Sequence, residues 1–196
     1  MPTTAIKAAA VSFSKSRRVY ERLSKRQIPH NLHRPAVAGA GGGGKIKRGA
    51  DKHYSLMSVA EIKALPVMQL AAPDGCHLYC WATNNYLPAA IDCIRAWGFE
   101  YVTTITWMKN QQGLGQYYRG LTEHCIFATT KKRLPYKVSP EGKRCQGKTG
   151  FYAPKTVHSC KPEEMRRMIE LVSYEPRIEI FARERFPGWD AWGDEV

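Results

Sequence analysis

Apolar residues recur at helical or strand spacing from about residue 51 onward, whereas the first 50 residues show little periodicity. Within "YLPAAIDCIRAWGF", the apolar residues that share one helical face are Leu87, Ile91, Ile94 and Trp97. Gly98 is typical of the end of such a helix. In "SVAEIKAL", Ser58 followed three residues later by Glu61 predicts a second helix that starts with a capping box.

A third helix is predicted in "SCKPEEMRRMIELVS", which offers a serine cap and a proline in the first turn. Its apolar face consists of Met165, Met168, Ile169 and Val172. Four segments are predicted to be strands, because they are rich in β-branched and aromatic residues or continuously apolar: "HLYCWAT", "EYVTTITWMK", "EHCIFATT" and "RIEIFAR". This alternation predicts an α/β fold, with a mostly parallel sheet and helices on both faces. Residues 131–158 are polar and glycine-dotted, which predicts a long loop with room for function.

The charge of the chain points toward a polyanionic partner. Its formal net charge is +13, and much of the positive charge is clustered. Solvated faces and a basic tail would also explain this charge, but a nucleic-acid substrate or partner explains its clustering. No apolar run approaches the ~20 residues of a membrane span, so no membrane association is expected. The six cysteines form no CxxC pair, which argues against a zinc site, and no metal is expected.

Polar groups near the ends of two predicted strands are candidates for chemistry. Glu179 lies within the late strand "RIEIF" and Arg183 lies just past it, where open α/β sheets bind ligands. A simple salt bridge at the strand end is the alternative. At the end of "TITWMKN", Trp107 and Lys109 suit base stacking and phosphate contact. The alternative for Trp107 is an ordinary core residue.

A His-Tyr pair and a run of four glycines precede the first predicted helix. His53 and Tyr54 precede the first helix, either as active-site residues or as a packing contact in a loop. Gly41 to Gly44 do not form a phosphate-binding loop, because the pattern GxxxxGK[ST] between a strand and a helix is absent.

Five blocks of the sequence occur in a fixed order: "KHYSLMSVAEIKALPV", "LYCWATNNYLPAAIDCIRAWGFEYVTTITWMKN", "GLGQYYRGLTEHCIFATT", "HSCKPEEMRRMIELV" and "RIEIFAR…GWDAWGDEV". From about Gly42 to the end they resemble the MT-A70 family of adenine methyltransferases. The resemblance implies a Rossmann-like, circularly permuted methyltransferase fold. It also implies S-adenosylmethionine as cofactor and the exocyclic amine of adenine as methyl acceptor, with "RIEIFAR" as the cofactor strand.

The resemblance assigns roles to particular residues. The cofactor would be surrounded by Lys161, Glu179, Phe181, Arg183, Asp194 and Glu195. Acidic partners suit the sulfonium, ammonium and ribose hydroxyls of this cofactor, and a lysine or arginine suits its carboxylate. The family usually has asparagine at the position of Asp194. The nucleic acid would be contacted by Lys45, Lys47, Arg48, Trp107, Lys109 and Arg119, and His53 and Tyr54 would lie at the catalytic centre.

The signature of the family, Asp-Pro-Pro-Trp after an early strand, is absent near Arg34 to Val37. In the family, a carboxylate and a backbone carbonyl localise the lone pair of the adenine amine, and an aromatic ring stacks on the extruded base. Possible codons for residues 26–40, shifted by one base, are compatible with "GKYRTIYTDPPWQER". The four consecutive glycines require a G-rich tract, where gain or loss of one base is easiest. We therefore interpret the missing signature as the result of a frameshift.

These inferences predict a basic N-terminal segment at residues 1–41, disordered or not native coding sequence, and a methyltransferase-like domain at residues 42–196. The first catalytic strand is expected to be lost or altered, leaving a gap in the sheet. The leading hypothesis is a cytoplasmic adenine methyltransferase that acts on DNA, with activity impaired in the present chain. The alternative is a non-catalytic nucleic-acid-binding relative of the same fold. A generic basic α/β domain would require the block matches to be coincidence.

Overall fold

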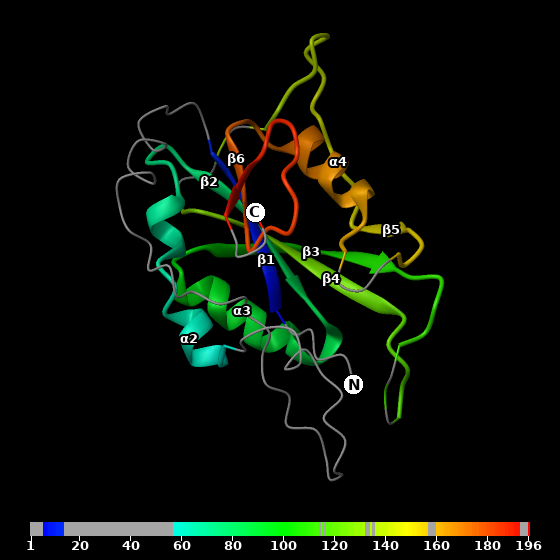
Figure 1. Ribbon diagram of the computed structural model, residues 1–196. Coiled ribbons are helices and arrows are strands. Elements are labelled where there is room, and N and C mark those ends of the chain that lie inside the picture. Colours follow the sequence, from blue (N-terminus) through cyan, green and yellow to red (C-terminus); the bar gives the residue numbers. More distant parts are fainter. Residues whose placement is uncertain are drawn as a thin grey trace.

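A computed structural model describes residues 6–13, 57–113, 115, 117–131, 134, 136–156, 160–192 and 196 (Figure 1). For residues 6–13 the description is limited to the backbone. The described part of the chain forms a seven-stranded sheet with helices packed against it.

Three α-helices occur where the sequence predicts them: α2 (Val59–Lys63), α3 (Leu87–Ala96) and α4 (Glu163–Val172). The capping box of α2 is confirmed, because Ser58 accepts a hydrogen bond from the Glu61 amide while the Glu61 carboxylate accepts one from the Ser58 amide. The end of α3 is also confirmed: Gly98 has a φ of 85°, a conformation that favours glycine. The predicted serine cap of α4 is wrong, because the helix begins after Pro162, which occupies the capping position without a side-chain hydrogen bond.

The strands are β1 (Ile6–Phe13), β2 (Cys76–Ala82), β3 (Glu100–Met108), β4 (Thr122–Thr129), β5 (Gly150–Tyr152), β6 (Arg177–Ile180) and β7 (Asp190–Trp192). They lie in the order β5-β3-β4-β2-β1-β6-β7. Four neighbouring pairs are antiparallel: β3–β4, β4–β2, β2–β1 and β1–β6. Only the outer pairs, β3–β5 and β6–β7, are parallel. The sheet is therefore mixed, and the prediction of a mostly parallel sheet is wrong.

The predicted gap beside the active site is also wrong, because β1 occupies an interior position between β2 and β6. It pairs antiparallel with both neighbours, from Ile6 opposite Ala82 to Phe13 opposite Cys76 on the β2 side. Hydropathy periodicity did not predict this strand, since it lies in the basic N-terminal segment. Its presence supplies hydrogen-bond partners to the backbones of β2 and β6.

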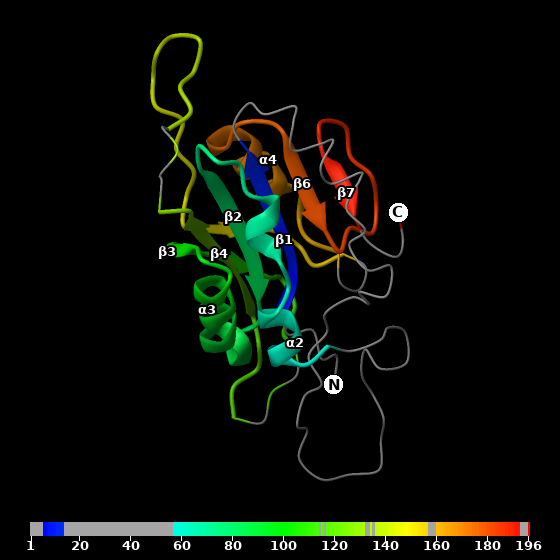
Figure 2. The same cartoon turned by 90° about the vertical axis from the view of Figure 1, so that its left-hand side faces the viewer.

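Helices cover both faces of the sheet (Figures 1 and 2). Strand β2 is buried at all seven positions, as expected for a strand that is covered on both sides. On one face, Leu78 and Cys80 pack in the same cluster as Cys93 and Ile94 of α3. On the other face, Tyr79, Trp81 and Cys125 pack with Met165 and Ile169 of α4. We call this second side the α4 face.

The loop predicted at residues 131–158 contains regular structure that its polar composition concealed. Strand β5 extends the edge of the sheet beside the second half of β3, with Thr106 opposite Gly150. Before β5 in the sequence, an isolated β-bridge between Val138 and Arg144 closes a turn. Among the described helices, none has the length and apolar character to cross a bilayer.

Candidate active site

The directions of the strands bring the carboxyl ends of three of them to the same end of the sheet. Strands β2 and β6 are both antiparallel to β1, and β2 and β3 are both antiparallel to β4, so β2, β3 and β6 run in the same direction. In open α/β sheets, ligands bind beyond the carboxyl ends of the strands. The segments that follow these strands are therefore the expected location of a ligand-binding or catalytic site.

A buried carboxylate lies at this end of the sheet. Glu123, the second residue of β4, is opposite Trp107 of β3 and has a side chain that is only 8% exposed. Its Oε2 accepts a hydrogen bond from Lys109 Nζ at 2.9 Å, and its Oε1 accepts one from Lys161 Nζ. Lys109 follows β3 and Lys161 precedes α4, so three separate segments meet at one carboxylate.

The two ammonium groups hold Glu123 in its ionised form. Burial alone would raise the pKa of this carboxyl, but attraction to Lys161 and Lys109 outweighs burial and lowers the pKa to about 2. Burial lowers the pKa of Lys161, and its attraction to Glu123 opposes that change. With two cations and one anion, the group carries a net positive charge at neutral pH.

Two indole rings complete this group. Lys161 Nζ lies 4.8 Å from the centre of the Trp81 ring, and Lys109 Nζ lies 4.8 Å from that of Trp107. The two rings meet edge to face at 6.1 Å. Trp107 is 2% exposed and donates a hydrogen bond from Nε1 to the Ala153 carbonyl at 2.8 Å. Its burial fits the interpretation of Trp107 as a core residue that supports Lys109. We call Glu123, Lys109, Lys161, Trp81 and Trp107 the Glu123 cluster.

The residues at the end of β6 form a second polar group. Glu179 Oε2 accepts a hydrogen bond from Arg166 Nη2 of α4 at 3.3 Å, and burial raises the pKa of Glu179 despite this arginine. Glu179 therefore forms an ion pair with Arg166 of α4. Phe181 has a φ of 62° and packs edge to face on Trp192 of β7 at 5.4 Å. Arg183 is half-buried just beyond.

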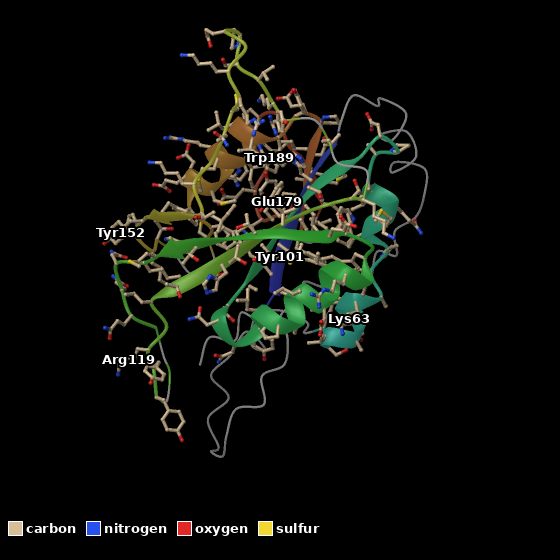
Figure 3. All side chains as sticks on the ribbon, turned by 180° about the vertical axis from the view of Figure 1, so that it is seen from behind. Lys63, Tyr101, Arg119, Tyr152, Glu179 and Trp189 are labelled. Carbon is tan, nitrogen blue, oxygen red and sulfur yellow. The ribbon has the colours of Figure 1, made fainter. Side chains whose placement is uncertain are left out.

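The structure brings some of the predicted residues together and separates others. Lys161 and Lys109, assigned to different ligands from the sequence, share Glu123. Arg166 lies on α4, five residues after Lys161, and its ion pair with Glu179 shows that Glu179 also lies on the α4 face. Arg119 lies apart, exposed on the connection between β3 and β4 (Figure 3).

Other predicted site residues lie outside the described part of the chain: Arg34 to Val37, Lys45, Lys47, Arg48, His53, Tyr54, Asp194 and Glu195. Within the described part, no group of three or more His, Cys, Asp or Glu side chains is arranged to hold a metal ion.

Sequence analysis missed Glu123 and the pair Tyr117–Tyr118. Glu123 was hidden as the first letter of an apolar strand, although an acidic residue inside a buried strand is itself a signal of a buried ion pair. The two tyrosines are 93% and 92% exposed, beside Arg119. Adjacent aromatic residues in a glycine-rich loop were the available signal for them.

Comparison with known proteins shows the family of the chain. A model of the MT-A70 family matches residues 44–195. The chain is 30% identical over 148 residues to the type II methyltransferase M.MunI of Mycoplasma sp, a match that covers 73% of this chain and 60% of that protein. It is 31% identical over 156 residues to the N6-methyladenosine RNA methyltransferase MTA1 of Cryphonectria parasitica, covering 72% and 44%. It is 27% identical over 174 residues to the human N(6)-adenine-specific methyltransferase METTL4, covering 77% and 34%. The matches thus span less than two thirds of the length of these relatives.

Proposed function

The chain belongs to the MT-A70 family, and we propose that it transfers a methyl group from S-adenosylmethionine to the exocyclic amine of adenine in DNA. The observation that carries this proposal is the Glu123 cluster, a buried and positively charged group at the carboxyl ends of the strands. The Mycoplasma relative, a type II methyltransferase by name, favours DNA. Other relatives are named RNA methyltransferases, so RNA belongs in the test.

The described residues fit the chemistry of the proposed cofactor. Glu179 is a half-buried carboxylate at the end of β6, suited to the ribose hydroxyls or the ammonium group. Lys161 is a cation that suits a carboxylate, and it already binds one in Glu123. When bound, S-adenosylmethionine supplies an electrophilic methyl group on a sulfonium.

Glu123 acts by positioning rather than by taking a proton. Because its pKa is about 2, it is a poor proton acceptor at neutral pH. It instead holds the ammonium groups of Lys109 and Lys161 in fixed places, and the Trp81 and Trp107 rings restrict them further. Lys161 then presents its charge toward the cofactor or the substrate from the start of α4.

The adenine amine is a poor nucleophile, and this chain lacks the Asp-Pro-Pro-Trp signature that would localise its lone pair. We propose that a frameshift has replaced this signature and that residues 1–40 are not native coding sequence. The present chain should therefore be impaired. A non-catalytic nucleic-acid-binding role is the second candidate, favoured by the missing signature.

The test is transfer of a tritiated methyl group to unmethylated DNA and to RNA. The present chain is compared with a variant in which "GKYRTIYTDPPWQER" replaces residues 26–40. The proposal expects methylated adenine in DNA from the restored variant and little or none from the present chain. A matched control carries Ala in place of the signature Asp. Nucleic-acid binding without transfer by the folded restored variant would support the second candidate. Codons that cannot encode the signature in any frame would exclude the frameshift.

A further inference from the structure

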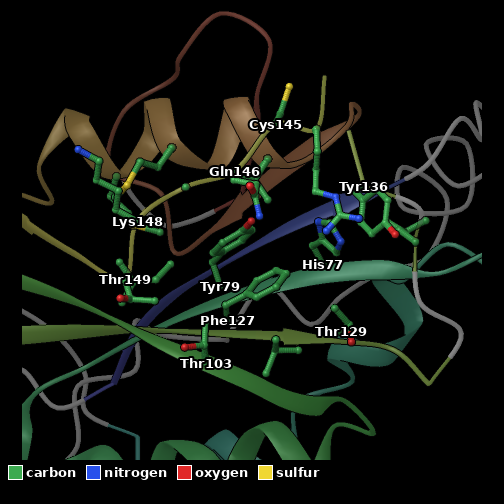
Figure 4. Close-up of a pocket in the computed structure, with 18 residues that line it drawn as sticks. His77, Tyr79, Thr103, Phe127, Thr129, Tyr136, Cys145, Gln146, Lys148 and Thr149 are labelled. Carbon is green, nitrogen blue, oxygen red and sulfur yellow. The ribbon is translucent and has the colours of Figure 1, made fainter. Parts of the chain in front are cut away.

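A cavity of about 450 Å³ lies on the α4 face, between the sheet, α4 and the segment at residues 134–149 (Figure 4). It extends from the end of the strands opposite to the Glu123 cluster toward that cluster, since Tyr79 and Ile105, which each lie two residues before a tryptophan of the cluster, also line it. Thr129 lines it at the end of β4, six residues from Glu123. Six residues of strand span about 20 Å. No residue of the Glu123 cluster lines the cavity, so the cavity is adjacent to the candidate active site but distinct from it.

The body of the cavity is apolar. Its apolar lining comes from strands β3 and β4, from α4 and from residue 134: Val102, Ile105, Phe127, Leu134, Met165, Met168 and Val172. A cavity of this size with apolar walls and a few convergent polar groups is the general form of a small-molecule site. Methionines and a phenylalanine ring suit the faces of a flat aromatic molecule.

One polar atom within the cavity wall has no partner in the described structure. Thr129 is 5% exposed, and its Oγ1 is buried without a hydrogen bond. A buried hydroxyl left unpaired is unfavourable, so the Thr129 side chain would gain stability by turning toward a polar ligand atom. Beside it, His77 Nδ1 and Tyr79 OH each lie 2.8 Å from Ser173 Oγ, and these bonds fix both rings in the wall (Figure 4).

The mouth of the cavity is cationic. The Arg144 guanidinium stacks over the Tyr136 ring at 3.6 Å from its centre, whereas Lys148 lines another part of the cavity (Figure 4). None of the described residues that line the cavity is an aspartate or a glutamate. An anionic group on a ligand would meet positive charge there without an opposing carboxylate in the lining.

We propose that this cavity binds a flat aromatic molecule that carries an anionic group. The ring lies among Phe127, Met165 and Met168, with Thr129 at the end of the cavity. The anionic group lies at Arg144. The site does not depend on methyl transfer, because none of its residues belongs to the Glu123 cluster.

The first test is a fluorescence titration of the full chain with 1-anilinonaphthalene-8-sulfonate, an aromatic anion. The expected result is saturable binding of one dye per chain. Met168→Trp fills the cavity from α4 and should weaken binding at least tenfold. Leu171→Trp, at a 45% exposed position of the same helix, is the matched control and should bind as the unchanged chain does. Equal binding by both variants, or no saturable binding at all, would overturn the proposal.

The second test isolates the charge. Arg144→Gln should weaken binding of the sulfonate several-fold while leaving binding of uncharged N-phenyl-1-naphthylamine unchanged. Lys143→Gln removes the same charge from an exposed residue outside the cavity and should change neither dye. Equal effects of the two substitutions would show general attraction to a basic protein and contradict the site. If circular dichroism shows that Met168→Trp does not fold, the comparison of Arg144→Gln with Lys143→Gln tests the site by itself.

Discussion

Glu123 shows how one side chain sets the properties of its surroundings. Its carboxylate is buried beside two lysines, and each of its oxygens binds one of them. Burial of three charges is unfavourable unless they compensate one another. Loss of the carboxylate would therefore leave two cations together in a poorly hydrated place.

We expect Glu123→Gln to lower the free energy of unfolding by about 3 kcal/mol, the usual cost of removing one partner of a buried ion pair. Urea unfolding followed by circular dichroism measures this change. Glu163→Gln is the control, because its pair with Arg167 is exposed on α4 and should contribute about 0.5 kcal/mol or less. A similar loss in both variants would show that the burial of Glu123 is not important for stability.

His77 should make stability depend on pH in the weakly acidic range. Burial lowers its pKa to about 4, from 6.5 in an exposed histidine. Between these values the unfolded chain binds a proton that the folded chain does not, so stability falls as pH falls from 6.5 to 4. The loss reaches about 3 kcal/mol at most.

Unfolding midpoints in urea at pH 7 and pH 4.5 measure this dependence, and His77→Gln should flatten it. The pKa of His124 is lowered in the same direction by its partial burial, so His124→Gln is the comparison, with a smaller effect expected. Glu123 contributes in a lower range, because its stabilisation is lost between its unfolded pKa near 4.5 and its folded value of about 2. An unchanged slope in His77→Gln would contradict the buried neutral imidazole.

At the scale of elements, β1 and the strand that we propose for the alternative frame would occupy the same position in the sheet. The interior position between β2 and β6 needs a strand, because the backbone groups of both neighbours require partners there. In the present chain, Ile6–Phe13 fills that position in antiparallel orientation. We expect the restored segment "GKYRTIY" to fill it instead in the corrected variant.

Deletion of residues 1–14 distinguishes the two arrangements. It should strongly destabilise the present chain, since β2 and β6 would lose their shared neighbour. It should change the melting temperature of the restored variant by only a few degrees. Thermal unfolding of the present chain and of the restored variant, each with and without residues 1–14, measures the difference. A restored variant that also requires residues 1–14 would show that β1 is a genuine strand of this fold.

At the scale of the whole molecule, a strongly basic chain carries exposed aromatic rings on the connection between β3 and β4. A net charge of +13 attracts nucleic acid without regard to sequence. Tyr117 and Tyr118 are almost fully exposed on the connection between β3 and β4, which begins beyond Lys109 of the Glu123 cluster. Exposed rings beside an arginine suit the stacking of unpaired bases.

We expect the double substitution of Tyr117 and Tyr118 by Ala to weaken binding of single-stranded DNA by roughly tenfold or more, because base stacking contributes about 1–3 kcal/mol per base. Fluorescence anisotropy with a labelled oligonucleotide measures this at fixed salt. Tyr101→Ala, at a 44% exposed position near the start of β3, controls for loss of an exposed ring. Equal binding by both variants would remove the connection between β3 and β4 from the nucleic-acid surface.

The sequence by itself determined the local elements and the family. Periodicity located α3 and α4 because each buries one apolar face, and the Ser58 capping box, a purely local signal, located α2. The order of long blocks was enough to predict membership of the MT-A70 family, which the family match confirms.

Only the tertiary structure decided the strand directions, the filling of the sheet and the site partners. Strand direction depends on which chains become neighbours, and alternation along the sequence does not specify that. Strand β1 carries no periodic signal strong enough to predict it, yet it satisfies the backbones of β2 and β6. Lys109 and Lys161 are 52 residues apart in sequence, yet both bind Glu123. Folding brings them together at a carboxylate from which water is largely excluded. Such a buried cluster is a property of the assembled sheet, where low hydration makes each charge depend on its neighbours.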